Sequence, residues 1–441
     1  MAADKQHPSS ELLIASGATR TSGGFRPDGR PRQGLITGHL FKLIRESAGL
    51  TQETLAEHLG VDANTVQGWE SGRRSLTGTR VATLVQVRHR LRQLGADPRL
   101  LSALDDAAEA DYVLAYALGT EPDKSQPAAH PLACWVPKSS FAYMLAWPFT
   151  GQRPIALEPQ ALRSRRGPVA QAPALTAEER MRFFQHLRVT AERSYADHEL
   201  DETGGTLLRR NVYYSLSWNQ SSETTAWLRE LEQREVRRLG RFDTWSPSWT
   251  AVRSLVVARA RQGDKEPLRH FIRTALSSDA CQAANLNYWA YWIGETTQTY
   301  SSDEFMAGDL GAWSGMALLR RFADSLVSTE SLFDLYVHSL WALLERRGRL
   351  LDTDPSLLGP WPTEARCSSM RATCQGSRAG SWSRFTMASG CYRSRYRASS
   401  HERGRADARA RAGGPDQLPV RDGPAQAVQA HRLVDRRHRQ P

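Results

Sequence analysis

The chain has 441 residues, a formal net charge of +11 at pH 7 and five cysteines. This length allows two or three domains, and the positive charge taken alone suggests a nucleic-acid partner. The cysteines are odd in number, irregularly spaced and without paired histidines, which disfavours a zinc site, so we expect reduced thiols and no metal.

The positive charge is spread unevenly along the chain. Residues 363–441 contain 16 Arg, no Lys and 6 acidic residues, and so contribute +10 of the +11. Residues 32–95 hold 9 Lys and Arg against 5 acidic residues, a local charge of +4. The pI near 9.7 therefore mostly describes the C-terminal tail and is weak support for DNA binding by the rest.

The first elements in chain order are an arm and three short helices. Residues 1–32 are rich in Ser, Gly, Pro and Arg, which predicts a flexible arm. Thr51 and Asp62 are expected N-caps of the second and third helices, and Gly60 is expected in the turn between them. Two short helices joined by so tight a turn predict a helix-turn-helix. The apolar residues that mark the three helices are Leu40, Leu43 and Ile44; Leu55, Ala56 and Leu59; and Val66 and Trp69.

A long, ordered set of motif residues runs through this stretch, namely Arg45, Gly49, Leu50, Thr51, Gln52, Leu55, Ala56, Leu59, Gly60, Val61, Thr65, Val66, Trp69, Glu70, Ser71 and Gly72. The set is similar to the Cro/repressor-type helix-turn-helix, the xenobiotic-response-element-like (XRE-like) family of bacterial and phage regulators. The resemblance implies a small five-helix-type DNA-binding domain over residues 33–95. It also implies an ion pair between Arg45 and Glu70, which joins the first and third helices, and a phosphate contact from Gln52. Gly72 is expected just after the third helix as a C′ glycine.

The third helix, residues 62–71, is the one expected in the major groove of double-stranded DNA. Its first turn presents Ala63 and Asn64, and helical spacing places Gln67 and Gly68 on the same face as Asn64. The two amides suit adenine, and Ala63 suits a thymine methyl. Gly68 departs from the longer side chains common at this position and removes one base contact. The other predicted DNA-binding residues are Thr65 and the basic Lys42, Arg73 and Arg74.

The basic residues would contact DNA phosphates through their positive charge. The alternative for each of them is an ordinary solvent-exposed surface residue with no role in DNA binding. Two or three base contacts per protomer give modest discrimination, which favours a homodimer on a two-part site.

Further helices are expected after the motif. Residues 79–94 continue the helical period and complete the domain. Residues 96–131 are predicted to hold a helix at 99–118 and a polar, proline-containing linker at 119–131. The apolar face of the helix at 99–118 would consist of Leu101, Leu104, Ala108, Tyr112 and Ala115.

Residues 132–174 are predicted to be an aromatic segment followed by a connection. The aromatic part, residues 132–149, is interrupted by Pro137, Lys138 and Pro148, so it cannot span a bilayer as one apolar helix. The aromatic side chains either form a partner surface or pack onto the helical domain, and packing is the favoured interpretation.

Residues 175–352 are expected to form a helical regulatory or oligomerisation domain with repeat-like helix pairs. Its tryptophans should build the core, while the amides of residues 285–294 could instead bind a ligand or a partner. Residues 36–351 as a whole also look like large regulators from actinobacteria. The expected helices are residues 176–196, 204–218, 222–238, 247–261, 265–277, 279–293, 303–326 and 329–347.

The tail, residues 353–441, is predicted to be disordered and Arg-rich. One interpretation is an arm that binds the DNA backbone nonspecifically. The other, slightly favoured because the change in composition after residue 362 is abrupt, is translation in a shifted reading frame of a GC-rich gene.

No sequence motif for catalysis or for a cofactor occurs in the chain, so we expect no enzyme and no cofactor. The sequence predicts an all-α, sequence-specific transcription regulator, cytoplasmic and nucleoid-associated, without membrane contact. A protein or small-molecule effector would act on its helical domain. The alternative is an adaptor of antitoxin or phage-regulator type. In such a protein the helical domain is the main effector, and DNA binding only tethers the protein.

Overall fold

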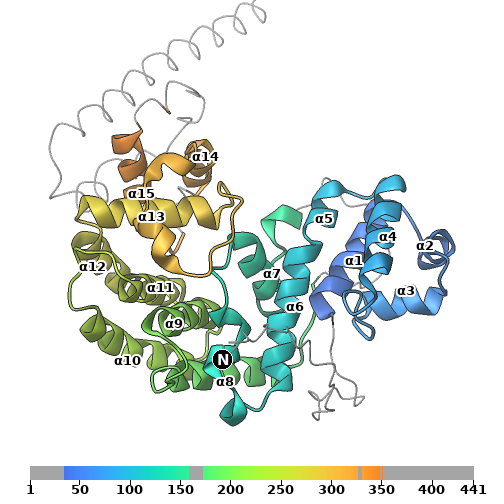
Figure 1. The fold of residues 1–441 in the computed structure, drawn as a ribbon, viewed down its shortest axis with the longest axis horizontal. Coiled ribbons are helices and arrows are strands. Elements are labelled where there is room, and N and C mark those ends of the chain that lie inside the picture. The colour runs from blue at the N-terminus through green and yellow to red at the C-terminus, as the bar shows by residue number, and fades with distance from the viewer. Residues whose placement is uncertain (1–33, 158–171, 326–329, 348–349, 351–441) are drawn as a thin grey trace, which may run out of the picture. The chain divides into compact units, whose positions relative to one another are not determined.

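The computed structural model describes residues 34–157, 172–325, 330–347 and 350 (Figure 1). These ranges contain helices and no strand, which confirms the predicted all-α class. The predicted arm at residues 1–32 and the predicted tail from residue 353 lie outside the described residues. The helices up to residue 150 are α1 Leu35–Ser47, α2 Gln52–Leu59, α3 Ala63–Glu70, α4 Val81–Gln93, α5 Pro98–Ser102, α6 Leu104–Gly119 and α7 Ser139–Thr150.

Helices α1, α2 and α3 enclose a small apolar core. Leu40, Leu55 and Val66 are fully buried, and Trp69 packs edge-on against Phe41 with ring centroids 5.8 Å apart. Leu59, also expected in this core, is only half-buried. In α4 the apolar residues Val87 and Leu91 are buried, whereas Val81 in its first turn is 77% exposed.

The backbones of α1 and α3 come closest at Gly38. A Cβ built on this glycine would lie 2.2 Å from the backbone oxygen of Trp69, much closer than real contacts allow. Only a residue without a side chain permits this approach. Sequence patterning did not single out Gly38, because nothing near it in the chain indicates that another helix will pack there.

Helix α6 supplies the cap of α1. The two carboxylate oxygens of Asp111 accept hydrogen bonds from the amides of Ile36 and Thr37, each at 2.8 Å. The first N–H groups of a helix have no partner within the helix, and a negative charge there is favourable. Gly34, the residue in the N-cap position, provides no side-chain bond. The start of α1 is therefore held by a residue more than 70 positions later.

The predicted apolar face of residues 99–118 is wrong at Tyr112, which is 59% exposed. The chain turns at Ala103, so that α5 and α6 are separate helices. Helix α6 buries Ala107, Asp111 and Leu114. The same buried face of α6 carries Asp111, whose carboxylate lies against the start of α1.

The stability of this junction should depend on pH through Asp111. Burial raises the pKa of Asp111 to about 6, although hydrogen bonds from the Ile36 and Thr37 amides oppose the shift. A carboxyl group whose pKa is raised on folding contributes stability that is complete below its ordinary value near 4, and that is lost as the pH rises through about 6. Wild type should lose up to about 3 kcal/mol of unfolding free energy from this group between pH 4 and pH 7.

Urea denaturation at several pH values, compared between wild type and Asp111→Asn, measures this contribution. At pH 4 the protonated carboxyl and the amide each offer one carbonyl acceptor, but only the carboxyl titrates, so the profile of Asp111→Asn should lack the Asp111 slope. Parallel profiles for the two proteins would contradict the assignment.

Residues 119–131, predicted to be a polar, proline-containing linker, have both buried and exposed side chains. They form three short 3₁₀ turns, and Ser125 and His130 are fully buried. The ring centroid of His130 lies 5.5 Å from that of His186, which belongs to helix α8 (Ala177–Arg193). Desolvation lowers the pKa of His130 to about 3, so the ring is neutral at ordinary pH. Prolines at the start of each turn make the segment rigid enough to be buried.

The aromatic segment forms α7, which packs against α6 and α1. Phe141, Trp147 and Phe149 are buried, and Trp147 lies edge-on to His39 of α1 with centroids 4.9 Å apart. The packing interpretation is therefore confirmed for these aromatic side chains, and the alternative of an exposed partner surface is wrong for them.

The second group of helices begins at residue 177. Successive helices pack against one another, α8 with α9, α10 with α11 and α11 with α12, and α9 also packs against α11. Trp289, Trp292, Trp313 and Trp341 are buried, as predicted for core residues. These helices are α8 Ala177–Arg193, α9 Glu202–Leu216, α10 Ser222–Leu239, α11 Pro247–Arg261, α12 Glu266–Ala275, α13 Asp279–Trp292, α14 Met316–Asp324 and α15 Phe333–Arg346.

The single helix predicted over residues 303–326 is wrong. Two 3₁₀ turns occupy its first half, Asp303–Ala307 and Leu310–Ala312, and only α14 is α-helical. Glycines at 308, 311 and 315 explain the difference, because glycine weakens a helix, and Gly315 has a left-handed φ of +86°.

The amides of residues 285–294 are bonded within the protein. Asn285 donates to the hydroxyl of Ser339 at 2.9 Å and accepts from Nε of Arg253 at 2.9 Å. Asn287 donates to the carbonyls of Met306 and Gly308. Their burial therefore reflects internal satisfaction of polar groups, not an open ligand site.

No helix in the described part of the chain is both long and apolar enough to cross a membrane. The described ranges also contain no group of three His, Cys, Asp or Glu side chains that could hold a metal ion.

Candidate nucleic-acid interface

Helices α2 and α3 are joined by a tight turn whose ends are set by local bonds. The hydroxyl of Thr51 accepts from the amide of Thr54 at 3.1 Å, which confirms Thr51 as the N-cap of α2. Gly60 has a left-handed φ of +67° and ends α2, as expected. Asp62 occupies the N-cap position of α3 but makes no side-chain capping bond. Gly72 follows α3 with a φ of +67°, as expected for a C′ glycine.

The two faces of α3 differ in chemistry. Val66 and Trp69 point into the core, whereas Asn64 and Gln67 are exposed one turn apart. Ala63 and Thr65 are half-buried beside them. A rigid helix with exposed amides and a buried apolar face is the arrangement that base reading requires.

A buried ion pair joins α1 to α3. Nε of Arg45 lies 2.5 Å from Oε1 of Glu70, and the two side chains are 9% and 4% exposed. The Arg45 guanidinium also donates to the Leu50 carbonyl at 2.7 Å, which ties the α1–α2 loop to the pair. The pair therefore fixes the orientation of α1 and α3, the role that the resemblance implies for it.

Gln52 lies at the start of α2 and takes part in the same cluster. Its side-chain nitrogen donates to Oε2 of Glu70 at 2.5 Å. This bond orients the amide. A phosphate contact from Gln52 therefore stays a prediction, and it requires a donor other than the N–H bonded to Glu70. Lys42, the other predicted phosphate contact on this side, is half-buried in α1.

The loop after α3 folds back over the helix. The amide of Arg74 donates to the carbonyl of Gly68 at 2.9 Å, and Nη1 of Arg74 lies 3.2 Å from the Thr65 hydroxyl. Nη2 of Arg73 lies 3.5 Å from the Asn64 carbonyl. Both arginines are exposed, so two cationic groups flank the amide-bearing face.

The structure corrects the expectation for Gly68. The residue is buried and is not a gap on the exposed face. A Cβ on Gly68 would lie 3.2 Å from Cδ of Arg74 and 3.6 Å from Nη2 of Arg73. The fold of the following loop, which helical spacing alone does not predict, places these side chains over the glycine.

Residues 41–87 match the family model described as Helix-turn-helix. This segment is a helix-turn-helix domain. The match includes α2 and α3 completely and parts of α1 and α4. No curated protein and no solved structure matches the chain. The wider resemblance of residues 36–351 to large actinobacterial regulators stays a prediction.

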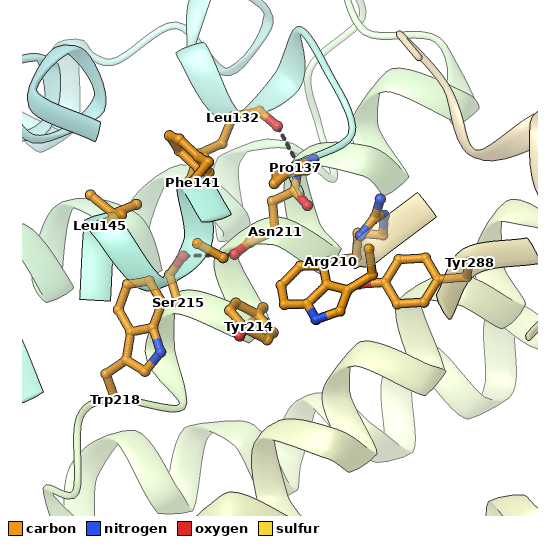
Figure 2. A pocket seen from close by; sticks show the side chains of 12 residues that line it. Leu132, Pro137, Phe141, Leu145, Arg210, Asn211, Tyr214, Ser215, Trp218 and Tyr288 are labelled. Atoms are coloured by element: carbon orange, nitrogen blue, oxygen red, sulfur yellow. Dashed lines mark hydrogen bonds between the residues drawn. The ribbon is translucent and has the colours of Figure 1, made fainter. Parts of the chain in front are cut away.

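A second candidate site is a shallow hollow bordered by α7, α9 and α13 (Figure 2). Its volume is about 300 Å³, including the part open to solvent. The guanidinium of Arg210 is held by Asp303 through bonds of 2.6 and 2.7 Å, and Asn211 donates to the Leu132 carbonyl at 2.9 Å. The aromatic residues of its wall are Phe141, Tyr214, Trp218, Tyr288 and Trp292.

The residues that sequence reasoning missed are Gly38 in α1 and Asp111 in α6, which follows the predicted DNA-binding domain. Both act by holding α1 in place, and neither belongs to the helix-turn-helix motif itself. An isolated glycine inside a helical pattern and an acid among apolar positions are the only signals that could have indicated them.

Proposed function

We propose that the protein is a sequence-specific transcription regulator that inserts α3 into the major groove of double-stranded DNA. The observation that supports this most is the exposed pair Asn64 and Gln67 on a helix whose other face is anchored in the core. Asn and Gln side chains recognise adenine through N6 and N7. The exposed Arg73 and Arg74 supply positive charge beside this face, where phosphates would lie.

Asn64→Ala and Gln67→Ala should reduce preference for the cognate DNA site and leave nonspecific binding nearly unchanged. Removal of either amide should cost about 1–3 kcal/mol of discrimination between bases. Binding measured on selected and scrambled DNA sequences tests this. Unchanged preference in both variants would show that this face does not read bases.

Arg73→Ala is the matched control. It removes a charge next to the same face, so it should weaken binding to all sequences about equally and reduce the dependence of affinity on salt.

Two finer parts of the function stay predictions from the sequence. A homodimer would double the small number of base contacts, and a palindromic site in an in-vitro selection would support it. An effector of the helical domain would have the aromatic hollow of Figure 2 as its candidate site. A ligand seated there would contact Trp218 and Trp292, so a ligand that alters DNA affinity without changing tryptophan fluorescence would count against this hollow.

A further inference from the structure

On α3, the side chain of Arg74 lies next to Gly68, a position at which the sequence predicts no side chain. Gly68 lies one turn after Asn64 and lacks a side chain of its own. Cγ and Cδ of Arg74 would be 3.4 and 3.2 Å from a Cβ built on Gly68, so the arginine stem occupies the place beside the glycine. The backbone bond from the Arg74 amide to the Gly68 carbonyl, 2.9 Å long, fixes this placement.

The guanidinium of Arg74 is directed along the helix toward its N-terminal turn. Its Nη1 lies 3.2 Å from the hydroxyl of Thr65, the neighbour of Asn64. Thr65 takes one N–H, and a guanidinium has five. The group is exposed and can therefore present two parallel donors beside the side chain of Asn64.

Two parallel donors on a planar cation suit one base edge above the others. Guanine presents O6 and N7 as adjacent acceptors in the major groove, and a bidentate arginine is the commonest specific contact to it. A phosphate also accepts two N–H bonds, but the bond to Thr65 holds this guanidinium against α3, beside the amide-bearing face. The bond from Arg74 to Thr65 thus favours a base edge as the target.

We propose that Arg74 reads a guanine in the major groove, in place of the side chain that Gly68 lacks. The proposal rests on the proposed function and adds to it one base and the residue that selects it. It assigns Arg74 a role different from that of Arg73, which keeps the phosphate contact predicted from the sequence.

The test is in-vitro selection of DNA sites with the full chain as wild type, Arg74→Lys and Arg73→Lys. Lysine keeps the charge but loses the planar fork. Arg74→Lys should lower the preference for one guanine in each half-site by about 5- to 150-fold, the equivalent of 1–3 kcal/mol, and leave the other positions unchanged. Arg73→Lys should retain the wild-type motif.

Gly68→Ala supplies a second variant in which Arg74 itself is intact. The new methyl group would press on the arginine stem, so preference for the same guanine should fall while preference at the other positions is kept. Thermal unfolding of each variant separates these effects from loss of the fold.

The outcomes are distinguishable. If Arg74→Lys selects the same DNA motif as wild type, the proposal is overturned. It is also overturned if a further variant, Arg74→Ala, loses affinity equally for all sequences, because Arg74 would then be a phosphate contact. If the wild-type protein selects no preferred sequence at all, the proposed function itself fails.

Discussion

Arg45→Ala is expected to lower the free energy of unfolding of the DNA-binding domain by about 3–5 kcal/mol, the cost of breaking a buried ion pair on one side. The Glu70 carboxylate, 4% exposed in the intact pair, would lose its cationic partner and retain the bond from Gln52. Because the pair links α1 with α3, DNA affinity should fall with stability. Urea denaturation and DNA binding of the full chain measure both effects.

The matched control is the double variant Arg45→Met with Glu70→Met. Replacing both charged groups by apolar side chains leaves no buried charge, and such replacements are often neutral or stabilising. The double variant should therefore be clearly more stable than Arg45→Ala. If Arg45→Ala unfolds within about 1 kcal/mol of wild type, as exposed pairs do, the pair does not hold α1 against α3.

Gly38→Ala is the second change with a large expected effect. Alanine favours a helix over glycine by about 1 kcal/mol, which alone would stabilise α1. The added Cβ, however, would meet the backbone oxygen of Trp69 at 2.2 Å, and a backbone carbonyl cannot rotate away as a side chain can. We expect a net loss at or above the roughly 1–3 kcal/mol typical of overpacking, and weaker DNA binding because α3 moves. Thermal unfolding and DNA titration test both.

Gly119→Ala provides the comparison for Gly38→Ala. Gly119 ends α6, and a Cβ built there has no atom within 4 Å. The same chemical change should be neutral or slightly stabilising at this position. Equal effects at the two glycines would contradict the assigned close approach between α1 and α3.

The local sequence was sufficient to predict those elements whose hydrogen bonds are formed between residues close together in the chain. Thr51 caps α2 through an amide three residues away, and Gly60 ends the same helix by its own backbone freedom. The periodicity of Val66 and Trp69 likewise set the buried face of α3, and so left Asn64 and Gln67 exposed. The helical class and the helix-turn-helix follow from such short-range patterns.

Sequence periodicity failed to predict the structure where glycines interrupt a helix. It also failed where a contact between distant segments decides which face of a helix is buried. The helix predicted over residues 303–326 breaks into turns at glycines that the apolar pattern does not register. Tyr112 is exposed although it falls on the predicted apolar face, because α6 buries a different face against α1, α7 and α8.

By itself, the sequence determined the all-α class and which two helices form the helix-turn-helix motif. Only the tertiary structure decided that Asp111 caps α1, that Gly38 lets α1 approach α3, and that Arg74 covers Gly68. The reason is physical. Helix formation depends on hydrogen bonds and side-chain spacing within a few residues, whereas unsatisfied helix ends and close backbone approaches are resolved by groups that only folding brings together.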